Sequence, residues 1–377
     1  MNYLDYNATT PLRPAVKVAM LAALEVCGNA SSIHAAGRRT RGIVEEARAK
    51  VAALAGADPG SVIFTSSGTE ANATVLKGVT GIARILISAI EHDSVRANAR
   101  AVAESMPCIE IQEIPVTADG VVNMDALRML LEGVKGRTLV CVMAANNETG
   151  VVQPIEAIAT LAKEFGALLH VDAVQAAGRM PLAFDTDYVT LSAHKLGGPQ
   201  GAGALIVKDG APLTPLIASG GQELNRRAGT ENVAALAAFG AAAEEATNFS
   251  AENACLAALR DGFEAKLKLL APDLIIFGAS APRLANTSNF AIPNLAAETA
   301  IIALDLDGVA VSSGAACSSG KVGRSHVLAA MGVSDELSRC GLRVSFGWAS
   351  TEQDADAAIA SLKKLLERKG ARALAAA

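Results

Sequence analysis

Aromatic residues are scarce in this chain of 377 residues, at 3%, and its charges do not cluster. The 33 lysines and arginines and the 38 aspartates and glutamates give a net charge of −5. No block of basic residues resembles a footprint for a phosphate backbone, so nucleic acid is not expected as a direct ligand. No apolar run approaches the ~20 residues that a membrane span needs. The longest run, Val233 to Ala243, ends in two glutamates, and no membrane contact is predicted.

Closely spaced cysteine pairs are absent as well. The six cysteines include no C-x-x-C pair and no zinc spacing, which argues against a disulfide framework and against a metal site. The N-terminus has neither the basic nor the apolar segment of a secretion signal. We therefore expect a reduced, cytoplasmic protein. Packing roles are expected for Cys27, Cys108, Cys141 and Cys255, and for Cys340 packing is favoured over a chemical role.

The hydrophobic content of 51% is enough for a large core. Short apolar runs such as Arg84–Ser88 and Thr138–Met143 alternate with helical patterns, which is typical of a parallel sheet buried on both faces. After about residue 250 the pattern changes to short strands and an amphipathic helix, Thr351–Lys369. We predict an α/β fold with a large domain over residues 15–255 and a mostly parallel central sheet. Residues 1–14 and 256–377 are predicted to form a smaller α+β domain.

A lysine followed by a glycine-rich loop, Lys195-Leu-Gly-Gly198, comes directly after a predicted strand. The ordinary interpretation is a surface lysine before a turn. The functional interpretation is an amine removed from water that attacks an aldehyde and forms a Schiff base. Ser192 and His194, which come just before Lys195, would let hydroxyl and backbone donors reach a phosphate.

Two further motifs precede this lysine in the chain. Asp172 ends another apolar strand, where its carboxylate could cap the next segment or pair with a protonated ring nitrogen of a cofactor. The small-residue turn Thr65–Thr69 leads into a predicted helix, whose first N–H groups form an anion site to which Thr69 adds a hydroxyl. The turn is not a Walker loop, because no G-K-[ST] follows. A phosphate site, a carboxylate and an aldehyde-binding amine, in this order along the chain, indicate pyridoxal phosphate.

A cysteine in an unusual setting completes the set. Cys317 lies among serines, glycines and alanines in Val311–Gly320, whereas Cys141 has the apolar neighbours of a packing residue. An incidental loop cysteine is one interpretation. A nucleophile is the other, and we favour it because an exposed free thiol is a liability unless it is used.

These motifs together resemble the cysteine desulfurases of the NifS/IscS type, in the class-V aminotransferase branch of the fold-type-I pyridoxal-phosphate enzymes. The resemblance runs from Tyr3–Thr10 to Leu342–Ser345, nearly the whole chain. It includes the Lys195, Asp172 and Cys317 motifs and further segments in the same order: Gly28–His34, Glu91-His92, Asn146–Gly150 and Arg226–Asn232.

The resemblance implies a role for each matching residue. Lys195 would hold pyridoxal phosphate and carry the Cα proton, His92 would stack on the ring and take part in proton transfer, and Cys317 would attack the substrate sulfur. Arg343 would bind the substrate carboxylate. The remaining contacts to the cofactor would come from Gly68, Thr69, Asn147, Asp172, Gln175, Ser192, His194 and, from the other subunit of a homodimer, Thr230; Asn147 would also contact substrate.

The resemblance therefore predicts an enzyme that converts L-cysteine to L-alanine and leaves a persulfide on Cys317. A protein acceptor would then take the sulfur for iron–sulfur cluster assembly or other sulfur delivery. The alternatives are a selenocysteine lyase, another class-V pyridoxal-phosphate enzyme, or a non-enzymatic scaffold with the same fold. The embedded thiol argues against a transaminase, which has no use for a nucleophile there.

Overall fold

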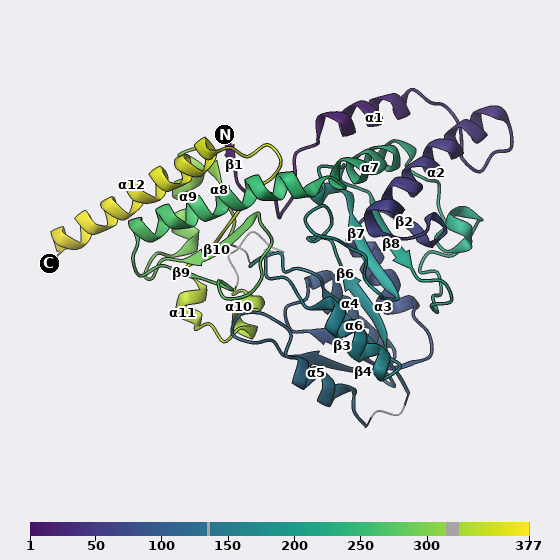
Figure 1. Cartoon of the computed structure of the whole chain (residues 1–377), viewed down its shortest axis with the longest axis horizontal. Coiled ribbons are helices and arrows are strands. Elements are labelled where there is room, and N and C mark those ends of the chain that lie inside the picture. Colours follow the sequence, from purple (N-terminus) through teal and green to yellow (C-terminus); the bar gives the residue numbers. More distant parts are fainter. Residues whose placement is uncertain (134–135, 314–323, 377) are drawn as a thin grey trace.

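The fold is described from a computed structural model, which covers residues 1–133, 136–313 and 324–376. Its largest sheet has seven strands in the order β2-β8-β7-β6-β5-β3-β4 (Figure 1). Neighbouring strands are parallel except around β8, which is antiparallel to both β2 and β7. The prediction of a mostly parallel sheet is confirmed. The strands are β2 (Val62–Thr65), β3 (Ile82–Ser88), β4 (Glu110–Ile114), β5 (Arg137–Met143), β6 (Leu168–Asp172), β7 (Tyr188–Ser192) and β8 (Gly203–Val207).

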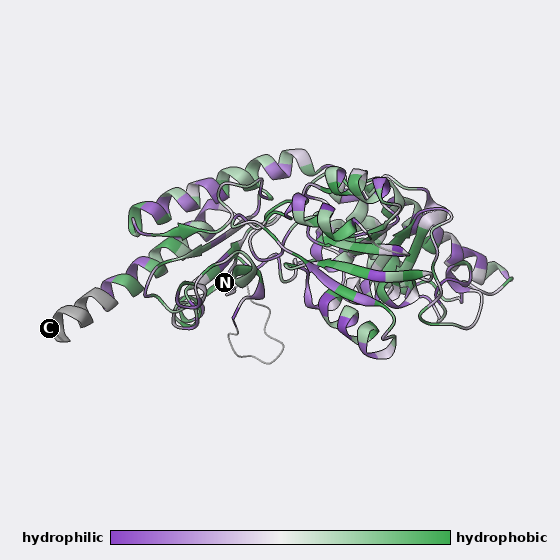
Figure 2. Cartoon of the chain, turned by 90° about the horizontal axis from the view of Figure 1, so that it is seen from below, coloured by the Kyte–Doolittle hydropathy of each residue, from purple (hydrophilic) through white to green (hydrophobic). Residues whose placement is uncertain are grey.

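Alternate side chains of each strand enter cores on opposite faces of this sheet. On β5, Val140 and Val142 join one core, whereas Leu139 and Cys141 join the other. Because side chains alternate along a strand, a strand covered on both faces is apolar throughout. In Figure 2 green predominates in the central strands, whereas the helices carry both colours. The helices of this part of the chain are α1 (Pro14–Leu24), α2 (Ala35–Ala55), α3 (Gly68–Gly78), α4 (Asp93–Ser105), α5 (Met124–Leu131), α6 (Ile155–Glu164) and α7 (Val233–Ala246).

The later part of the chain builds smaller sheets together with the N-terminus. β10 (Thr287–Ala291) pairs antiparallel with β9 (Ile275–Ile276) and with β12 (Gly341–Ser345). β1 (Asn2–Tyr3) pairs parallel with β11 (Val309–Ala310), so the chain's beginning lies beside residues about three hundred positions later. The helices here are α8 (Phe249–Leu270), α9 (Ala297–Leu306), α10 (His326–Ala330), α11 (Asp335–Ser338) and α12 (Glu352–Ala376).

A separate apolar core holds this smaller assembly together. It combines Leu4 with Phe263, Phe290 and Phe346, and the ring of Phe263 meets the other two edge-on at 5.9 Å. Helix α8 continues without a break across residues 255 and 256 and links the two assemblies (Figure 1). The domain division at these residues stays a prediction.

Three cysteine assignments were wrong. Cys27, Cys108 and Cys255 are exposed, whereas Cys141 and Cys340 are buried. Cys27 follows helix α1, Cys108 lies in the turn before β4, and Cys255 is on the solvent side of α8. Composition alone did not distinguish these positions from core ones, because each has apolar or alanine neighbours in sequence.

Strand β4 was not predicted either. Its sequence, Glu-Ile-Gln-Glu-Ile, is polar at three of five positions, because it lies at the edge of the sheet and is only partly covered.

No helix in the described part of the chain is long and apolar enough to cross a membrane.

The close approach of a glycine to an aromatic ring in the smaller assembly predicts a stability effect. A Cβ on Gly347 would lie 1.8 Å from Cδ1 of Tyr6, a residue that is 2% exposed. We expect Gly347→Ala to lower the free energy of unfolding by about 1–3 kcal/mol, because the ring cannot move aside without disturbing the core. Chemical denaturation measures this change.

Gly262 is the matched control, since nothing lies within 4 Å of a Cβ built there and the residue is inside helix α8. Gly262→Ala should leave stability unchanged or raise it by up to about 1 kcal/mol. Equal stabilities of the two variants would contradict this account of Gly347.

Candidate active site

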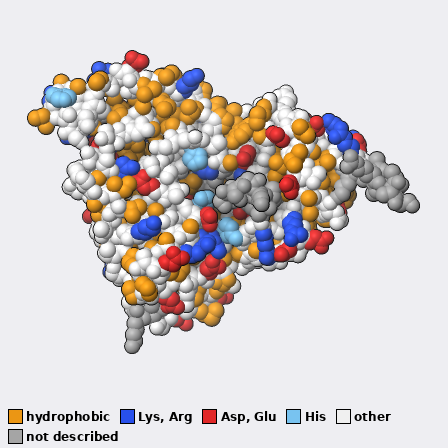
Figure 3. Space-filling view, turned by 180° about the vertical axis from the view of Figure 1, so that it is seen from behind, with side chains coloured by type: hydrophobic (Ala, Val, Ile, Leu, Met, Phe, Trp, Pro, Cys, Tyr) orange, Lys and Arg blue, Asp and Glu red, His pale blue; other side chains and the backbone are white. Residues whose placement is uncertain are grey.

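A cavity of about 580 Å³ lies at the carboxyl ends of the parallel strands, next to the smaller assembly. In Figure 3, histidine and charged side chains gather near the middle of the face shown. The predicted site residues that line this cavity are Gly68, Thr69, His92, Asn147, Asp172, Gln175, Ser192, His194, Lys195 and Arg343.

Two predicted residues are not among the lining residues. Thr230 is exposed and does not line the cavity of its own chain. Cys317 lies outside the described residues. Ser312 and Ser313, which come shortly before it in the sequence, do line the cavity.

Strand ends and helix starts bring the lining residues together. β6 ends at Asp172 and β7 at Ser192, while α3 begins at Gly68 and α4 directly after His92. The carboxyl ends of parallel strands share one edge of the sheet, and helices returning from that edge point their N-termini at it. Residues far apart in sequence therefore meet there because each is at the same position in its own β–α unit.

The amine of Lys195 is held by backbone oxygens of the N-terminal segment. Its Nζ donates hydrogen bonds to the carbonyls of Asn7 and Ala8. Burial, together with the nearby cations Arg343 and Arg179, lowers the pKa of Lys195 to about 7. An amine with this pKa is present in both its neutral and its charged form near pH 7, and the neutral form can act as a nucleophile.

Asp172 is buried at 6% exposure and has partners on both carboxylate oxygens. Oδ1 accepts the backbone N–H of Val174 at 3.0 Å, so the capping interpretation is correct for this oxygen. Oδ2 accepts Nδ2 of Asn72 at 2.8 Å. Both bonds hold the carboxylate at the cavity wall.

Asn72 also connects Asp172 with His92. Its Nδ2 donates to Oγ of Ser94 at 2.9 Å, and this Oγ lies 2.8 Å from Nδ1 of His92. Nδ1 accepts the backbone N–H of Ser94, so the proton of the neutral ring is on Nε2. Asn72 was not predicted as a site residue. Its spacing of four from Gly68, on one face of α3, is the signal that could have identified it.

The anion-binding end of the cavity is formed by α3. Ser67 caps this helix by accepting the N–H of Glu70 at 3.1 Å, so the first N–H groups at Gly68 and Thr69 remain available to an anion. A Cβ on Gly68 would lie 3.0 Å from Val174, so a larger residue would crowd the cavity there. The pKa of His194 is lowered to about 4 by burial and by Lys195, which makes it a neutral partner at pH 7.

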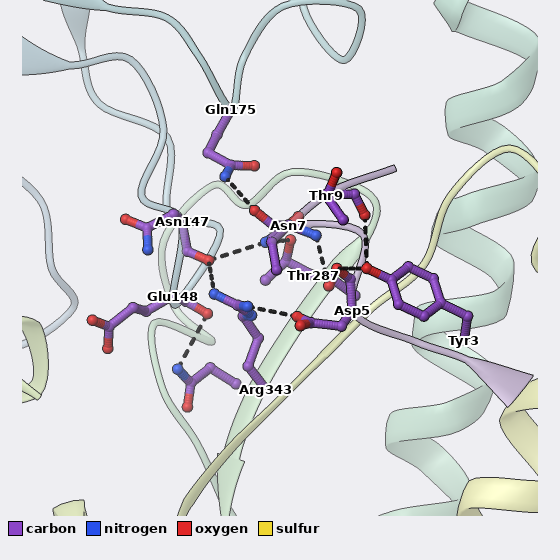
Figure 4. Close-up of polar contacts among 12 residues, drawn as sticks. Tyr3, Asp5, Asn7, Thr9, Asn147, Glu148, Gln175, Thr287 and Arg343 are labelled. Atoms are coloured by element: carbon purple, nitrogen blue, oxygen red, sulfur yellow. Dashed lines mark hydrogen bonds and ion pairs between the residues drawn. The ribbon is translucent and has the colours of Figure 1, made fainter. Parts of the chain in front are cut away.

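The side chain of Arg343, on β12, contacts the N-terminal segment (Figure 4). Nη2 forms an ion pair with Oδ1 of Asp5 at 2.6 Å, and Nη1 donates to the carbonyl of Asn147 at 3.0 Å. The residue is 4% exposed. The predicted substrate arginine is therefore oriented by two partners from distant parts of the chain.

Asn7 ties the N-terminal segment to this region. Its Nδ2 donates to the carbonyl of Asn147 and to Oγ1 of Thr287, and its own carbonyl accepts Nε2 of Gln175 at 2.9 Å (Figure 4). Sequence reasoning identified Tyr3–Thr10 as a matching segment but gave none of its residues a role. No charge, spacing or periodicity there indicates a contact with residues so far away in sequence.

The fold and these contacts define a class-V aminotransferase: the chain belongs to this family, whose pattern matches residues 2–358. The chain is 40% identical to "Cysteine desulfurase IscS" of Dictyoglomus turgidum, over 97% of this chain and 94% of that protein. It is 38% identical to "IscS-like cysteine desulfurase" of Mycobacterium tuberculosis, over 100% and 99%. A NifS-like protein from Rickettsia africae has a similar structure, with a TM-score of 0.88, 36% identity and coverage of 97% and 99%.

Members of this family use pyridoxal phosphate, and the cavity's chemistry fits that group. Its aldehyde, ring nitrogen and phosphate call for a neutral amine, a carboxylate and an anion site. Lys195, Asp172 and the N-terminus of α3 provide these on one cavity of suitable size. The volume and the arrangement of donors therefore agree with the family's cofactor.

A buried acid lies directly behind this site. Glu91 is fully buried; its Oε1 accepts Oγ of Ser88 and the N–H of Met143, both at 2.6 Å. Oε2 has no partner among the described residues. Burial raises the pKa of Glu91 to about 8, and the charge of Asp172 contributes in the same direction. Glu91 therefore holds its proton at neutral pH.

This raised pKa predicts a pH-dependent stability. Between about pH 4.5 and 8 the folded protein retains a proton on Glu91 that the unfolded chain releases, so stability falls as pH rises. The slope from one such proton is at most about 1.4 kcal/mol per pH unit. Glu91→Gln removes this loss, so its stability relative to wild type should increase from pH 5 to 8 and level off above.

Denaturation of both proteins across this pH range measures the difference. Glu298→Gln, at an exposed position on α9, is the control and should follow wild type. A difference between Glu91→Gln and wild type that does not change with pH would show that Glu91 is ionised in the folded protein.

Proposed function

We propose that this chain is a pyridoxal-phosphate-dependent cysteine desulfurase that leaves the sulfur of L-cysteine as a persulfide on Cys317. The observation that carries the proposal is a single cavity with three groups on its wall. These are the amine of Lys195, whose pKa is about 7, the buried carboxylate of Asp172 and the guanidinium of Arg343. The full-length relatives named cysteine desulfurases bear out the predicted class of activity.

Pyridoxal phosphate, when bound, supplies an aldehyde that combines with amines and a ring that accepts electron density. Lys195 would bind the aldehyde and Asp172 would face the ring nitrogen. Gln175 would donate to the ring hydroxyl, since its Nε2 has two N–H groups and donates, within the described part of the chain, to the carbonyl of Asn7. The other residues proposed to hold the group are Gly68, Thr69, His92, Asn147, Ser192 and His194, and they line the same cavity.

The chain's own residues divide the reaction among them. Arg343, with Asn147 beside it, would bind the carboxylate of L-cysteine, and Lys195 and His92 would move the protons. The thiolate of Cys317 would attack the substrate sulfur. The new S–S bond forms as the C–S bond breaks, and the carbon skeleton keeps that electron pair, takes up a proton and leaves as L-alanine.

We further propose that the chain works as a cytoplasmic homodimer. Thr230 is exposed and does not line the cavity of its own chain, which supports a contact with the cofactor phosphate of the other subunit. The acceptor of the sulfur would be a protein of iron–sulfur cluster assembly or of another sulfur-delivery route.

The role of Lys195 is tested by Lys195→Ala. This variant should lose the visible absorbance of the linked cofactor and at least about 10²-fold of its alanine release from cysteine, since covalent linkage and proton transfer are lost together. Lys208→Ala is the control, because Lys208 is a surface lysine paired with Asp185. Near wild-type turnover by Lys195→Ala would end the assignment.

The role of Cys317 is tested by intact-mass measurement after brief exposure to L-cysteine. Wild type should gain one sulfur atom and Cys317→Ala none, while the variant keeps its cofactor and releases almost no alanine. Cys255→Ala is the control, because Cys255 is an exposed thiol away from the cavity. Persistent release of alanine and sulfide by Cys317→Ala would indicate a lyase, and efficient turnover of selenocysteine alone would indicate a selenocysteine lyase.

A further inference from the structure

The guanidinium that would bind substrate is already paired with a carboxylate of the chain itself. We propose that Asp5 is an affinity-determining residue, which competes with the carboxylate of the amino-acid ligand for Arg343. The inference rests on the proposed function, because it takes Arg343 as the ligand's binding group. It concerns ground-state binding and adds no chemical step.

Backbone contacts on both sides of Asp5 fix its position. Its backbone forms a bridge with Ser345, two residues after Arg343 on the same strand. The hydroxyl of Tyr3 lies 3.1 Å from the carbonyl oxygen of Asp5 and 2.9 Å from that of Thr9, and its one proton is shared between them, which closes the segment around Asp5 (Figure 4). The carboxylate is therefore held against the guanidinium by the backbone on either side of it.

The charges explain why one carboxylate is needed. Arg343 is 4% exposed, so its charge would be costly without a partner. Among the described residues, Asp5 is the acid within ion-pair distance of Arg343. Glu148 is also nearby, but its carboxylate accepts Oγ of Ser325 at 2.5 Å, and burial raises its pKa. Asp5 thus neutralises the guanidinium when no substrate is bound.

The same charges explain the competition. A ligand carboxylate binds best when it takes a guanidinium by two parallel N–H bonds. Nη2 already donates to Asp5, and Nη1 to the carbonyl of Asn147. Nε of Arg343 has no partner among the described residues, so a ligand carboxylate could bind there and reach Nη2, which already donates to Asp5. The two carboxylates would then lie against one guanidinium, and their repulsion is poorly screened in a buried cavity. Asp5 therefore weakens the hold on both substrate and product carboxylates and favours the release of L-alanine.

Asp5→Asn separates charge from position, because the amide oxygen can still accept from Nη2 of Arg343. Calorimetric titration of the purified holoenzyme compares two probes, L-alanine and L-alaninamide, which differ in the carboxylate. We expect Asp5→Asn to bind L-alanine about tenfold more tightly than wild type, the scale of one charge-assisted contact. The affinity for L-alaninamide should be unchanged.

Glu252→Gln is the matched control. Glu252 pairs with Arg13 at 2.8 Å and helps to hold the N-terminal region, but it does not line the site cavity. This variant should bind both probes like wild type. If Asp5→Asn does not fold, Asp5→Ser, which also replaces the charge with a neutral acceptor, serves for the same comparison.

Unchanged or weaker binding of L-alanine by the neutral variants would overturn the proposal. So would an equal shift for both probes, because a general distortion of the site does not distinguish the carboxylate from the amide. Desulfuration of L-cysteine by wild type is assayed separately. Its absence would count against the proposed function, while the binding comparison would still decide the role of Asp5.

Discussion

The removal of Lys195 from water is the constraint on which the rest of the site depends. A buried ammonium is costly, and the structure meets this cost by bringing the pKa of the amine to about 7. Two nearby cations, Arg343 and Arg179, also lower the pKa of Lys195. Asp172 and Asp5 raise this pKa, so the amine is balanced between its neutral and charged forms and is not fixed in either one.

The N-terminal segment is what makes this balance possible. It supplies carbonyls to Lys195, a carboxylate to Arg343 and an amide to Asn147 and Thr287. These partners come from the segment after β7, from the loop after β5 and from the smaller sheet, so one short stretch joins the large sheet to the small one. Asn7 and Ala8 therefore line the candidate active site, and Asp5 contacts one of its residues.

Much of the site could be predicted because its residues lie at the ends of recognisable elements. Asp172 and Lys195 follow apolar strands, and Gly68 and Thr69 begin a helix, so the sequence alone indicates their chemistry and spacing. Exposure by itself does not identify a reactive cysteine, since Cys27, Cys108 and Cys255 are exposed thiols to which no role is assigned. What sets Cys317 apart is that its segment follows Ser312 and Ser313 at the cavity.

The sequence by itself determined the α/β class, the mostly parallel sheet, the family and the set of reactive groups, because apolar periodicity and ordered motifs are local properties. Only the tertiary structure decided the partners of those groups. Asn72 contacts Ser94 and Asp172, which are 22 and 100 positions away, and Asp5 contacts Arg343, which is 338 positions away. Such pairings depend on how strands and helices stack. Burying these polar and charged groups is costly unless each meets its partner, and no single segment encodes that meeting.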